Sequence, residues 1–268
     1  MTYQFTRIAV KIGSNVLTRK DGSLDVTRMS ALVDQVAELH RHGVEVVLIS
    51  SGAVASGRSE VKPGKKLDAV SARQLYSAVG QAKLINRYFE LFREHKIACG
   101  QVLTTKENFG SRTHYLNQKH CMEVMLDNNV IPIVNENDSV SYKEIESEDR
   151  LFGDNDMLSS VVSVLCRAKR LVIFSDIDGF YDSDPRLHPN AKLIKEIRQI
   201  DESVYSLAGG AGSRRGTGGM RTKLQAAELA ASQGIDTIVT NGKHPEALYD
   251  IVNGKQAGTL FVGNKDCL

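Results

Sequence analysis

The chain has 268 residues, of which 41% are hydrophobic and 25% are charged, and its formal net charge is +2. These values are typical of a folded chain with a sizeable core, and such a small net charge gives no strong field for nucleic acid or a membrane surface. The cysteines are scattered and form no C-x-x-C pair, which excludes a disulfide framework. The chain has no signal-peptide core and no apolar run long enough to span a membrane, so we expect a cytoplasmic protein.

The first predicted element is a buried strand over Arg7–Ile12, which ends in the turn Gly13-Ser14-Asn15. Lys11 is out of place in a buried strand unless its ammonium group faces an anion; the alternative is an edge-strand lysine whose side chain reaches solvent. The second strand, Val44–Ile49, runs into Ser50-Ser51-Gly52-Ala53 at the start of a helix. This turn is either an anion or carboxylate site or an ordinary serine cap.

Further helices and strands fill the first half of the chain. A helix that Asp25 or Thr27 caps and Gly43 ends precedes the second strand. Ser71-Ala72-Arg73-Gln74 fits a capping box at the start of a long helix that ends near His95. After it we expect a strand over Ile97–Leu103, a helix from about Ser111 to Asn128 and a strand over Val130–Val134.

Acid and amide side chains cluster in the second half. Asn135-Glu136-Asn137-Asp138 follows the fourth strand, and Gly153-Asp154-Asn155-Asp156 precedes a helix over Met157–Cys166 that Asp154 or Asn155 would cap. Between them, the charged run Lys143–Arg150 is either a lid or hairpin or a plain solvated loop. The remaining predicted strands are Leu171–Phe174, which ends at Ser175-Asp176, then Lys192–Ile197, Thr237–Val239 and Leu260–Val262.

The stretch Gly209–Lys223 is rich in glycine and leads directly into a helical run over Leu224–Ala231. Glycine lets the backbone approach a ligand closely, and the first N–H groups of a helix favour an anion. This stretch therefore predicts a phosphate cradle with Lys223 at its rim, and the alternative is a mobile surface loop. There is no Walker A run and no His-Arg-Asp loop, so a nucleotide would bind through another architecture.

Strands alternate with helices nearly throughout, which indicates an α/β fold with a mostly parallel sheet covered on both faces. Ligands of such sheets gather outside the carboxyl ends of the strands. Five polar side chains lie at or just past predicted strand ends, and we expect them to converge on one rim of the sheet: Lys11, Ser51, Asn135, Asp138 and Asp176.

These residues suit phosphoryl transfer, which needs positive charge around the transferred group. Lys11 and Lys223 can reach one polyphosphate, with Asp156 as their shared counter-ion. Mg²⁺ would bind mainly to the phosphate oxygens. If the acceptor is a carboxylate, no general base is needed, and the dispersed histidines offer none. Donors and acceptors for a small zwitterion come from Asn135, Asp138, Asn155 and the Ser51-Gly52 turn.

Five motifs in order carry a resemblance to a known family: Val10-Lys11-Ile12-Gly13-Ser14, Ser50-Ser51-Gly52-Ala53, Asn135-Glu136-Asn137-Asp138, Gly153-Asp154-Asn155-Asp156 and Gly216-Thr217-Gly218-Gly219-Met220-Arg221-Thr222-Lys223. From about Arg7 to Phe261, the chain resembles the glutamate 5-kinases of the amino-acid kinase family. The resemblance implies a three-layer α/β/α sandwich with a mainly parallel eight-stranded sheet. It also implies ATP-dependent phosphorylation of the γ-carboxylate of L-glutamate to L-glutamyl 5-phosphate, the first step of proline biosynthesis.

The resemblance implies roles for particular residues. Lys11 and Lys223 stabilise the transferring phosphoryl group, and Asp156 orients them. The implied glutamate-binding residues are Ser51, Gly52, Asn135, Asp138 and Asn155. The implied ATP-binding residues are Lys11, Ser175, Asp176, Thr217, Gly218, Gly219, Met220, Arg221, Thr222 and Lys223.

The resemblance also implies a single domain over residues 5–268, with a glutamate-binding lobe to about 168, an ATP-binding lobe after it, and no C-terminal PUA domain. A dimer or tetramer, feedback inhibition by proline and transfer of the product to glutamyl phosphate reductase are expected on the same ground, with no metal site formed by the protein. Ser175 departs from the threonine of many members but keeps the hydroxyl. The stretch between Asp138 and Gly153 is longer than in the family, next to a region linked to proline feedback.

Two kinds of alternative remain. The acceptor could be acetylglutamate, aspartate, carbamate or a nucleoside monophosphate, although the Asn135–Asp138 run favours glutamate. A non-catalytic amino-acid sensor with the same fold would be expected to lack one of the lysines or the acid, yet Lys11, Lys223 and Asp156 are all present. The pair Arg214-Arg215 is too little for a nucleic-acid site at this net charge.

Overall fold

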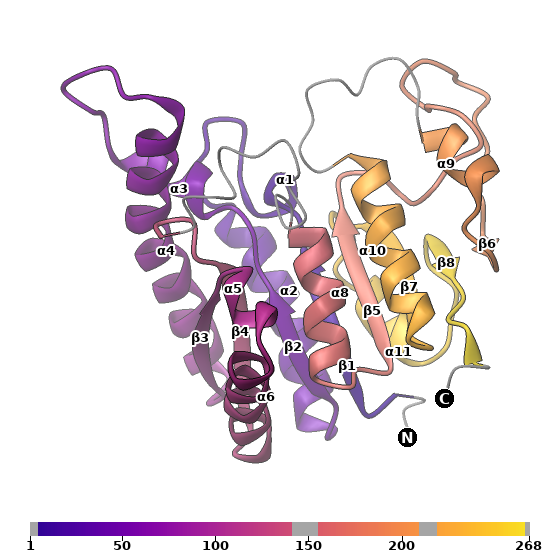
Figure 1. Ribbon diagram of the computed structural model, residues 1–268, viewed down its shortest axis with the longest axis horizontal. Coiled ribbons are helices and arrows are strands. Elements are labelled where there is room, and N and C mark those ends of the chain that lie inside the picture. Colours follow the sequence, from indigo (N-terminus) through magenta and orange to yellow (C-terminus); the bar gives the residue numbers. More distant parts are fainter. Residues whose placement is uncertain (1–4, 141–154, 209–218, 266–268) are drawn as a thin grey trace.

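The computed structural model describes residues 5–140, 155–208 and 219–265, and these ranges form one eight-stranded sheet with helices on both faces (Figure 1). The strand order is β3-β4-β2-β1-β5-β7-β8-β6. Neighbouring strands in this order are parallel except β7 and β8, which run antiparallel. The strands are β1 (Arg7–Ile12), β2 (Glu45–Ile49), β3 (Ala98–Thr104), β4 (Val130–Glu136), β5 (Arg170–Ser175), β6 (Glu196–Ile197), β7 (Asp236–Asn241) and β8 (Thr259–Phe261).

The helices form the two outer layers, which confirms the predicted three-layer α/β/α sandwich. One hydrophobic core packs beneath α2 (Val26–Arg41), α4 (Ala69–Glu94) and α11 (Ala247–Val252). The other packs beneath α6 (Arg112–Asp127), α8 (Asn155–Leu165) and α10 (Met220–Ser232). The shorter helices are α1 (Ser14–Leu17), α3 (Ala53–Glu60), α5 (Glu107–Gly110) and α9 (Glu202–Ala208).

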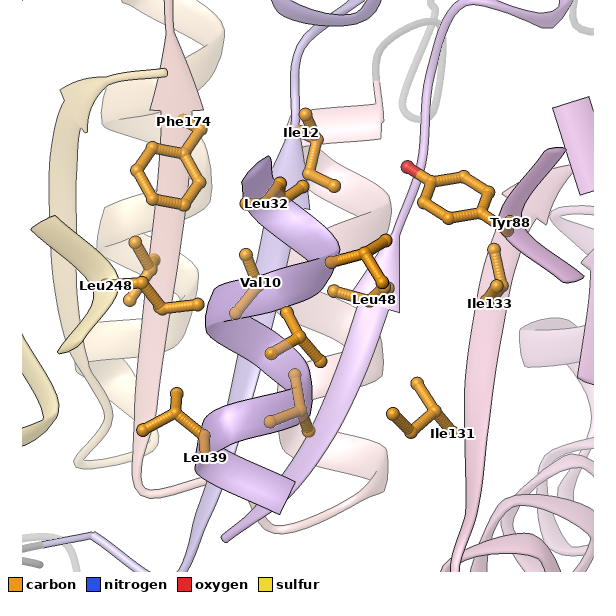
Figure 2. Packing of buried hydrophobic residues seen from close by; sticks show 14 of the residues in the cluster. Val10, Ile12, Leu32, Leu39, Leu48, Tyr88, Ile131, Ile133, Phe174 and Leu248 are labelled. Carbon is orange, nitrogen blue, oxygen red and sulfur yellow. The ribbon is translucent and has the colours of Figure 1, made fainter. Parts of the chain in front are cut away.

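The central strand β1 divides its side chains between the two cores. Val10 and Ile12 belong to the first core, where Figure 2 shows them with residues of α2 and the neighbouring strands. Ala9 belongs to the second core. Because successive side chains of a strand point to opposite faces, Lys11 is turned toward the face that α8 and α10 cover.

The boundaries of the long helices test the predicted caps. The side chain of Asp25 accepts a hydrogen bond from Arg28 N at the start of α2, so of the two predicted candidates Asp25 is the cap. For α4 the predicted capping box is wrong: the cap is Asp68, which accepts from Ser71 N. Both Asp68 and Ser71 are residue types that cap helices, and the sequence pattern placed the helix start too late.

Several elements were absent from the prediction or shorter than expected. The sequence did not indicate the short helices α1, α5, α9 and α11, and α1 begins within the predicted turn Gly13-Ser14-Asn15. Of the strand predicted over Lys192–Ile197, only Glu196–Ile197 forms a strand, while Leu193 makes an isolated bridge to Tyr181. None of the helices in the described ranges combines the length and apolar character that crossing a bilayer requires.

Helices α3 and α4 touch through glycine, and this contact holds one wall of the site described below. A Cβ atom at Gly80 would lie 1.7 Å from the carbonyl oxygen of Ala53, and one at Gly57 would lie 1.8 Å from that of Tyr76. Both obstacles are backbone atoms, which cannot rotate away as a side chain can. The two helices must therefore separate to admit a methyl group at either position.

Gly80→Ala is expected to lower the free energy of unfolding by at least about 1–3 kcal/mol, because the added methyl group overpacks this contact. Urea denaturation of the wild-type and variant proteins measures the difference. Gly64→Ala is the matched control, because a Cβ atom there meets nothing within 4 Å. Equal stability of the wild type and Gly80→Ala would contradict the close contact.

Candidate active site

A buried cluster of three charges lies at the carboxyl end of β1. Lys11 Nζ is 2.6 Å from Asp156 Oδ1, and Lys223 Nζ is 3.0 Å from Asp156 Oδ2. Asp156 is 0% exposed, and the two lysines are 4% and 5% exposed. Two ammonium groups thus share one carboxylate, and the cluster carries one net positive charge in a dry part of the protein.

Three separate elements supply this cluster. Lys11 is the fifth residue of β1, Asp156 lies in the first turn of α8, and Lys223 lies in the first turns of α10. Both helices begin at the rim where the parallel strands end (Figure 1). The Thr222 hydroxyl also donates to Asp156 Oδ2, at 3.0 Å, and Ser160 Oγ donates to the carbonyl of Ala226, which ties α8 to α10.

Two opposing effects set the ionisation of Asp156. Burial by itself raises the pKa of this carboxyl, but the charges of Lys11 and Lys223 outweigh burial and lower the pKa to about 2. Asp156 is therefore ionised at neutral pH. An ionised carboxylate is what both ammonium groups require as a counter-ion in a buried position.

A second acid lies at the end of β5. Asn15 Nδ2 donates to Asp176 Oδ2 at 2.9 Å, and Ser175 Oγ donates to Asp176 Oδ1 at 3.2 Å. Burial raises the pKa of Asp176, yet the hydrogen bonds from Asn15 and Ser175 and the charge of Lys223 outweigh burial and lower it. The turn after β1 and the end of β5 are thereby joined beside the charged cluster. Asn15 was seen in the sequence only as part of a turn.

A cavity of about 470 Å³ opens on the other side of the Asn155–Asp156 pair. Asn155 faces this cavity while its neighbour Asp156 holds the lysines. The volume is in the range of small-molecule sites and suits an amino acid with solvent. The polar and charged residues that line the cavity are Ser14, Ser51, Arg58, Arg73, Asn135, Glu136, Asp138 and Asn155.

A chain of amide side chains forms the inner wall of the cavity. Asn155 Nδ2 donates to Ser50 O, Ser51 Oγ and Asn135 Oδ1 at 2.7, 3.1 and 2.9 Å. Asn135 Nδ2 donates to Gln81 Oε1 at 3.3 Å, and Gln81 Nε2 donates to the carbonyl of Glu136 at 3.2 Å. The chain fixes the orientation of Asn155 from a helix, α4, that the sequence did not connect with the site.

Ser51 and Gly52 form the turn between β2 and α3. Gly52 has a φ of +92°, a left-handed conformation that side chains rarely adopt, and a Cβ atom there would lie 3.3 Å from Thr18 Cγ2. The glycine thus lets the chain turn sharply at the cavity wall. Ser50 is fully buried below this turn and its hydroxyl is 3.1 Å from the Tyr88 hydroxyl.

The cavity also holds an ion pair that the sequence did not reveal. Arg73 Nε and Nη2 both donate to Asp138 Oδ1, at 2.9 and 2.7 Å, and Nη2 is 3.7 Å from Glu136 Oε2. A second guanidinium, that of Arg58, lies 5.5 Å from the ring centroid of Tyr76. Arg73 was predicted only as part of a helix cap, and no local signal links it to Asp138, which is 65 residues away.

Comparison with known proteins supports the fold and identifies the family. The family model described as "Amino acid kinase family" matches residues 6–241. The chain belongs to the amino acid kinase family. This amino acid kinase is 59% identical over 253 residues to "Glutamate 5-kinase" of Bacteroides thetaiotaomicron, with 94% of the chain and 68% of that protein covered. It is 44% identical to "Glutamate 5-kinase" of Clostridium perfringens, with 97% and 96% covered.

Solved structures agree with this amino acid kinase at the level of the fold. The crystal structure of UMP kinase from Bacillus anthracis superposes with a TM-score of 0.66 at 15% identity, covering 97% of both chains. Carbamate kinase from Giardia lamblia superposes with a TM-score of 0.66 at 15% identity, covering 97% of this chain and 99% of the other. At such low identity the likeness concerns the fold alone.

The structure brings most of the predicted site residues of this amino acid kinase to the same rim. Met220 packs against the second core, and the Arg221 guanidinium lies 5.7 Å from the Tyr205 ring centroid. Gly219 precedes α10, and Thr222 contacts Asp156. Thr217 and Gly218, the charged run Lys143–Arg150, and Gly153-Asp154 lie outside the described residues. The functional roles of all these residues stay predictions.

Proposed function

We propose that this amino acid kinase transfers the γ-phosphoryl group of ATP to the γ-carboxylate of L-glutamate and forms L-glutamyl 5-phosphate, the first step of proline biosynthesis. The observation that carries the proposal is the buried cluster of Lys11, Asp156 and Lys223 next to a cavity of amino-acid size. The names of the relatives, "Glutamate 5-kinase", support the choice of acceptor. A small cavity with both acidic and basic walls suits a zwitterion better than a phosphate ester whose organic group is apolar.

The reaction needs orientation and charge rather than a base. The γ-carboxylate of glutamate, with an ordinary pKa of about 4.3, is ionised at neutral pH and attacks the γ-phosphorus of ATP directly. A bond forms between a carboxylate oxygen and phosphorus, the bond from phosphorus to the β–γ bridging oxygen breaks, and ADP takes the electron pair. Lys11 and Lys223 stabilise the negative charge on the transferring group, and Asp156 holds both ammonium groups in place.

Magnesium enters as part of the nucleotide substrate. Among the described residues, no group of three His, Cys, Asp or Glu side chains is placed to hold a metal ion. Asp176, the acid beside the Lys223 charge, already accepts from Asn15 and Ser175. In this proposal Mg²⁺ binds mainly through the phosphate oxygens of ATP and water and neutralises charge on the phosphates; in kinase sites one or two carboxylates commonly complete its coordination.

The two halves of the chain divide the substrates in this proposal. Strands β1 to β4 and their helices form the cavity, which would bind glutamate, and the half from β5 onward would bind ATP through Ser175, Asp176 and the residues from Thr217 to Lys223. The resemblance further suggests feedback inhibition by proline, assembly into dimers or tetramers, and transfer of the product to glutamyl phosphate reductase. Each is open to direct measurement with purified protein.

The decisive experiment is an assay for hydroxamate that depends on both ATP and glutamate, because hydroxylamine traps an acyl phosphate directly. We expect hydroxamate formation with glutamate. A coupled assay with acetylglutamate, aspartate, carbamate and nucleoside monophosphates covers the other acceptors. Turnover with only one of these would overturn the choice of glutamate, and binding without turnover of any acceptor would favour an amino-acid sensor.

Asp138→Ala is expected to raise the KM for glutamate on the order of tenfold or more, because a charged hydrogen bond to the substrate ammonium group is lost. The KM for ATP is expected to stay near its wild-type value, since Asp138 lies in the wall of the cavity and not among the residues around Lys223. Steady-state kinetics with each substrate varied in turn measures both constants. Equal increases in both KM values would contradict this role.

A further inference from the structure

The guanidinium group of Arg73 is the feature of the cavity that the proposed reaction has not yet used. It lies in the same wall as Asp138 and is joined to it by two hydrogen bonds that end on one oxygen, Oδ1. Its side chain is 28% exposed, compared with 11% for that of Asp138. Positive and negative groups thus stand side by side at the surface of a cavity that would hold a zwitterion.

The position of Arg73 in its helix argues against a purely structural reason for the residue. Arg73 is the fifth residue of α4, near the helix start, where the helix dipole disfavours a positive charge. In addition, its two contacts with Asp138 are not the fork-to-fork arrangement, in which each guanidinium nitrogen meets its own carboxylate oxygen and the pair is most stable. A bound anion would therefore stabilise the Arg73 guanidinium, because it would offset the helix dipole and accept further hydrogen bonds.

The location of the lysines fixes which end of glutamate would meet this pair. Asn155 lines the cavity, and the next residue, Asp156, holds Lys11 and Lys223. The reacting γ-carboxylate must approach the phosphoryl group at that end. The α-amino and α-carboxylate groups then extend toward the remaining charged groups of the cavity wall, Asp138 and Arg73.

We propose that Arg73 binds the α-carboxylate of the amino-acid substrate while Asp138 binds its α-ammonium group, so that the Arg73–Asp138 pair recognises the zwitterion. This inference rests on the proposed function and adds a specificity-determining residue to it. A planar guanidinium suits a carboxylate because its N–H groups match the spacing of the two oxygens. Arg73 thus selects ligands with an α-carboxylate over amines of the same length, and Asp138 selects α-amino acids over dicarboxylates.

Arg58 lines the same cavity and provides a matched comparison. Its guanidinium lies over the ring of Tyr76, 5.5 Å from the centroid, and among the described residues it forms no hydrogen bond or ion pair with Asp138. It supplies the same charge to the cavity in a different place. If long-range charge alone favoured the substrate, Arg58 and Arg73 would contribute alike; if Arg73 contacts the carboxylate, only Arg73 distinguishes ligands that differ at that group.

The test is a binding cycle with full-length protein and three ligands, measured by isothermal titration calorimetry. The ligands are L-glutamate, its α-amide (isoglutamine), which lacks the α-carboxylate charge, and glutarate, which lacks the α-ammonium group. For the wild type we expect isoglutamine to bind about tenfold to a hundredfold more weakly than glutamate, as loss of a charged hydrogen bond predicts. In Arg73→Met this ratio is expected to fall to about one, because the group that reads the charge is gone.

Two controls keep this result specific. Arg73→Met should still bind glutarate more weakly than glutamate, because Asp138 remains, and this shows that the pocket has kept its structure. Arg58→Met should keep the wild-type ratio of isoglutamine to glutamate. If Arg73→Met weakens glutamate and isoglutamine by the same factor, Arg73 is a structural partner of Asp138 and the inference is wrong.

Binding separates this inference from the proposed reaction. A wild type that binds glutamate with the expected ratios but forms no hydroxamate would remove the proposed activity and leave the role of Arg73 intact. If the wild type forms hydroxamate but Arg73→Met keeps the wild-type ratio of isoglutamine to glutamate binding, the proposed activity stands and the role of Arg73 is wrong. A wild type that binds none of the three ligands would overturn both.

Discussion

Replacing Lys223 with alanine is expected to lower kcat for glutamate phosphorylation on the order of a hundredfold or more, through loss of transition-state charge stabilisation. Lys223 is buried, lies 3.0 Å from Asp156 and is placed at the start of α10, where the triphosphate would end. A charge in so dry a position interacts strongly with developing negative charge, because little water screens it. Steady-state kinetics at saturating ATP and glutamate measures the loss.

Further variants separate charge from packing at this position. Lys223→Met keeps most of the side-chain volume and should lose as much kcat as Lys223→Ala. Lys11→Ala is expected to behave similarly, since Lys11 shares the same carboxylate. Lys255→Ala is the control: Lys255 is an exposed lysine paired with Asp250 at 2.9 Å, and its removal should leave kcat unchanged. Near-normal turnover in folded Lys223→Ala would remove the proposed role of this residue.

The sequence predicted the meeting of Lys11 and Asp156 for a reason that is general to parallel sheets. A lysine within an apolar strand and acids at the start of a helix are both local signals: Lys11 lies near the end of β1, and Asp156 lies in the first turn of α8. In a mostly parallel sheet the strands end, and the helices that follow them begin, at one rim, so the pattern carries three-dimensional information. Lys223 was found in the same way, because a glycine-rich stretch led into its helix.

The other wall of the cavity could not be predicted in this way. Arg73 and Gln81 lie within α4, and their partners Asp138 and Asn135 are more than 50 residues away in sequence. In a helical run, an arginine or a glutamine is typical of an exposed face, so neither stands out. The close approach of α3 to α4 through Gly57 and Gly80 helps to bring this helix face to the cavity, and such packing leaves no periodic signal.

Asp156→Asn is expected to destabilise the protein more than any other substitution considered for the site. Asparagine keeps the shape of the side chain and removes its charge, which leaves the buried ammonium groups of Lys11 and Lys223 without their shared counter-ion. Removing one partner of a buried ion pair typically costs about 3–5 kcal/mol. Urea denaturation at neutral pH measures the loss, and kcat is expected to fall as well because both lysines lose their positions.

Asp250→Asn is the matched control for this effect. Asp250 also pairs with a lysine, Lys255, but the pair is largely exposed. Exposed pairs contribute about 0–1 kcal/mol, so this variant should be almost as stable as the wild type. The two substitutions make the same chemical change, and only burial distinguishes them. Equal, small losses in both variants would contradict the view that Asp156 neutralises two buried charges.

The pH dependence of stability gives an independent measurement of the same charge. The pKa of Asp156 is lowered from 3.8 to about 2 in the folded state, so the folded protein binds a proton at this site less readily than the unfolded chain. The resulting stability is fully present above pH 3.8 and is lost as the pH falls toward 2. The difference in unfolding free energy between the wild type and Asp156→Asn should therefore be constant near neutral pH and shrink below pH 4.

A nucleotide should partly restore the stability of Asp156→Asn, because in the proposed site its phosphates bring negative charge to both lysines. A ligand that binds the folded protein and not the unfolded chain raises the Tm, so the shift in Tm reports this neutralisation. ATP is expected to raise the Tm of Asp156→Asn by more than it raises the Tm of the wild type. Adenosine has no phosphates, so it should shift the Tm of both proteins by the same amount. An equal Tm shift by ATP in both proteins would mean that the triphosphate does not lie against Lys11 and Lys223.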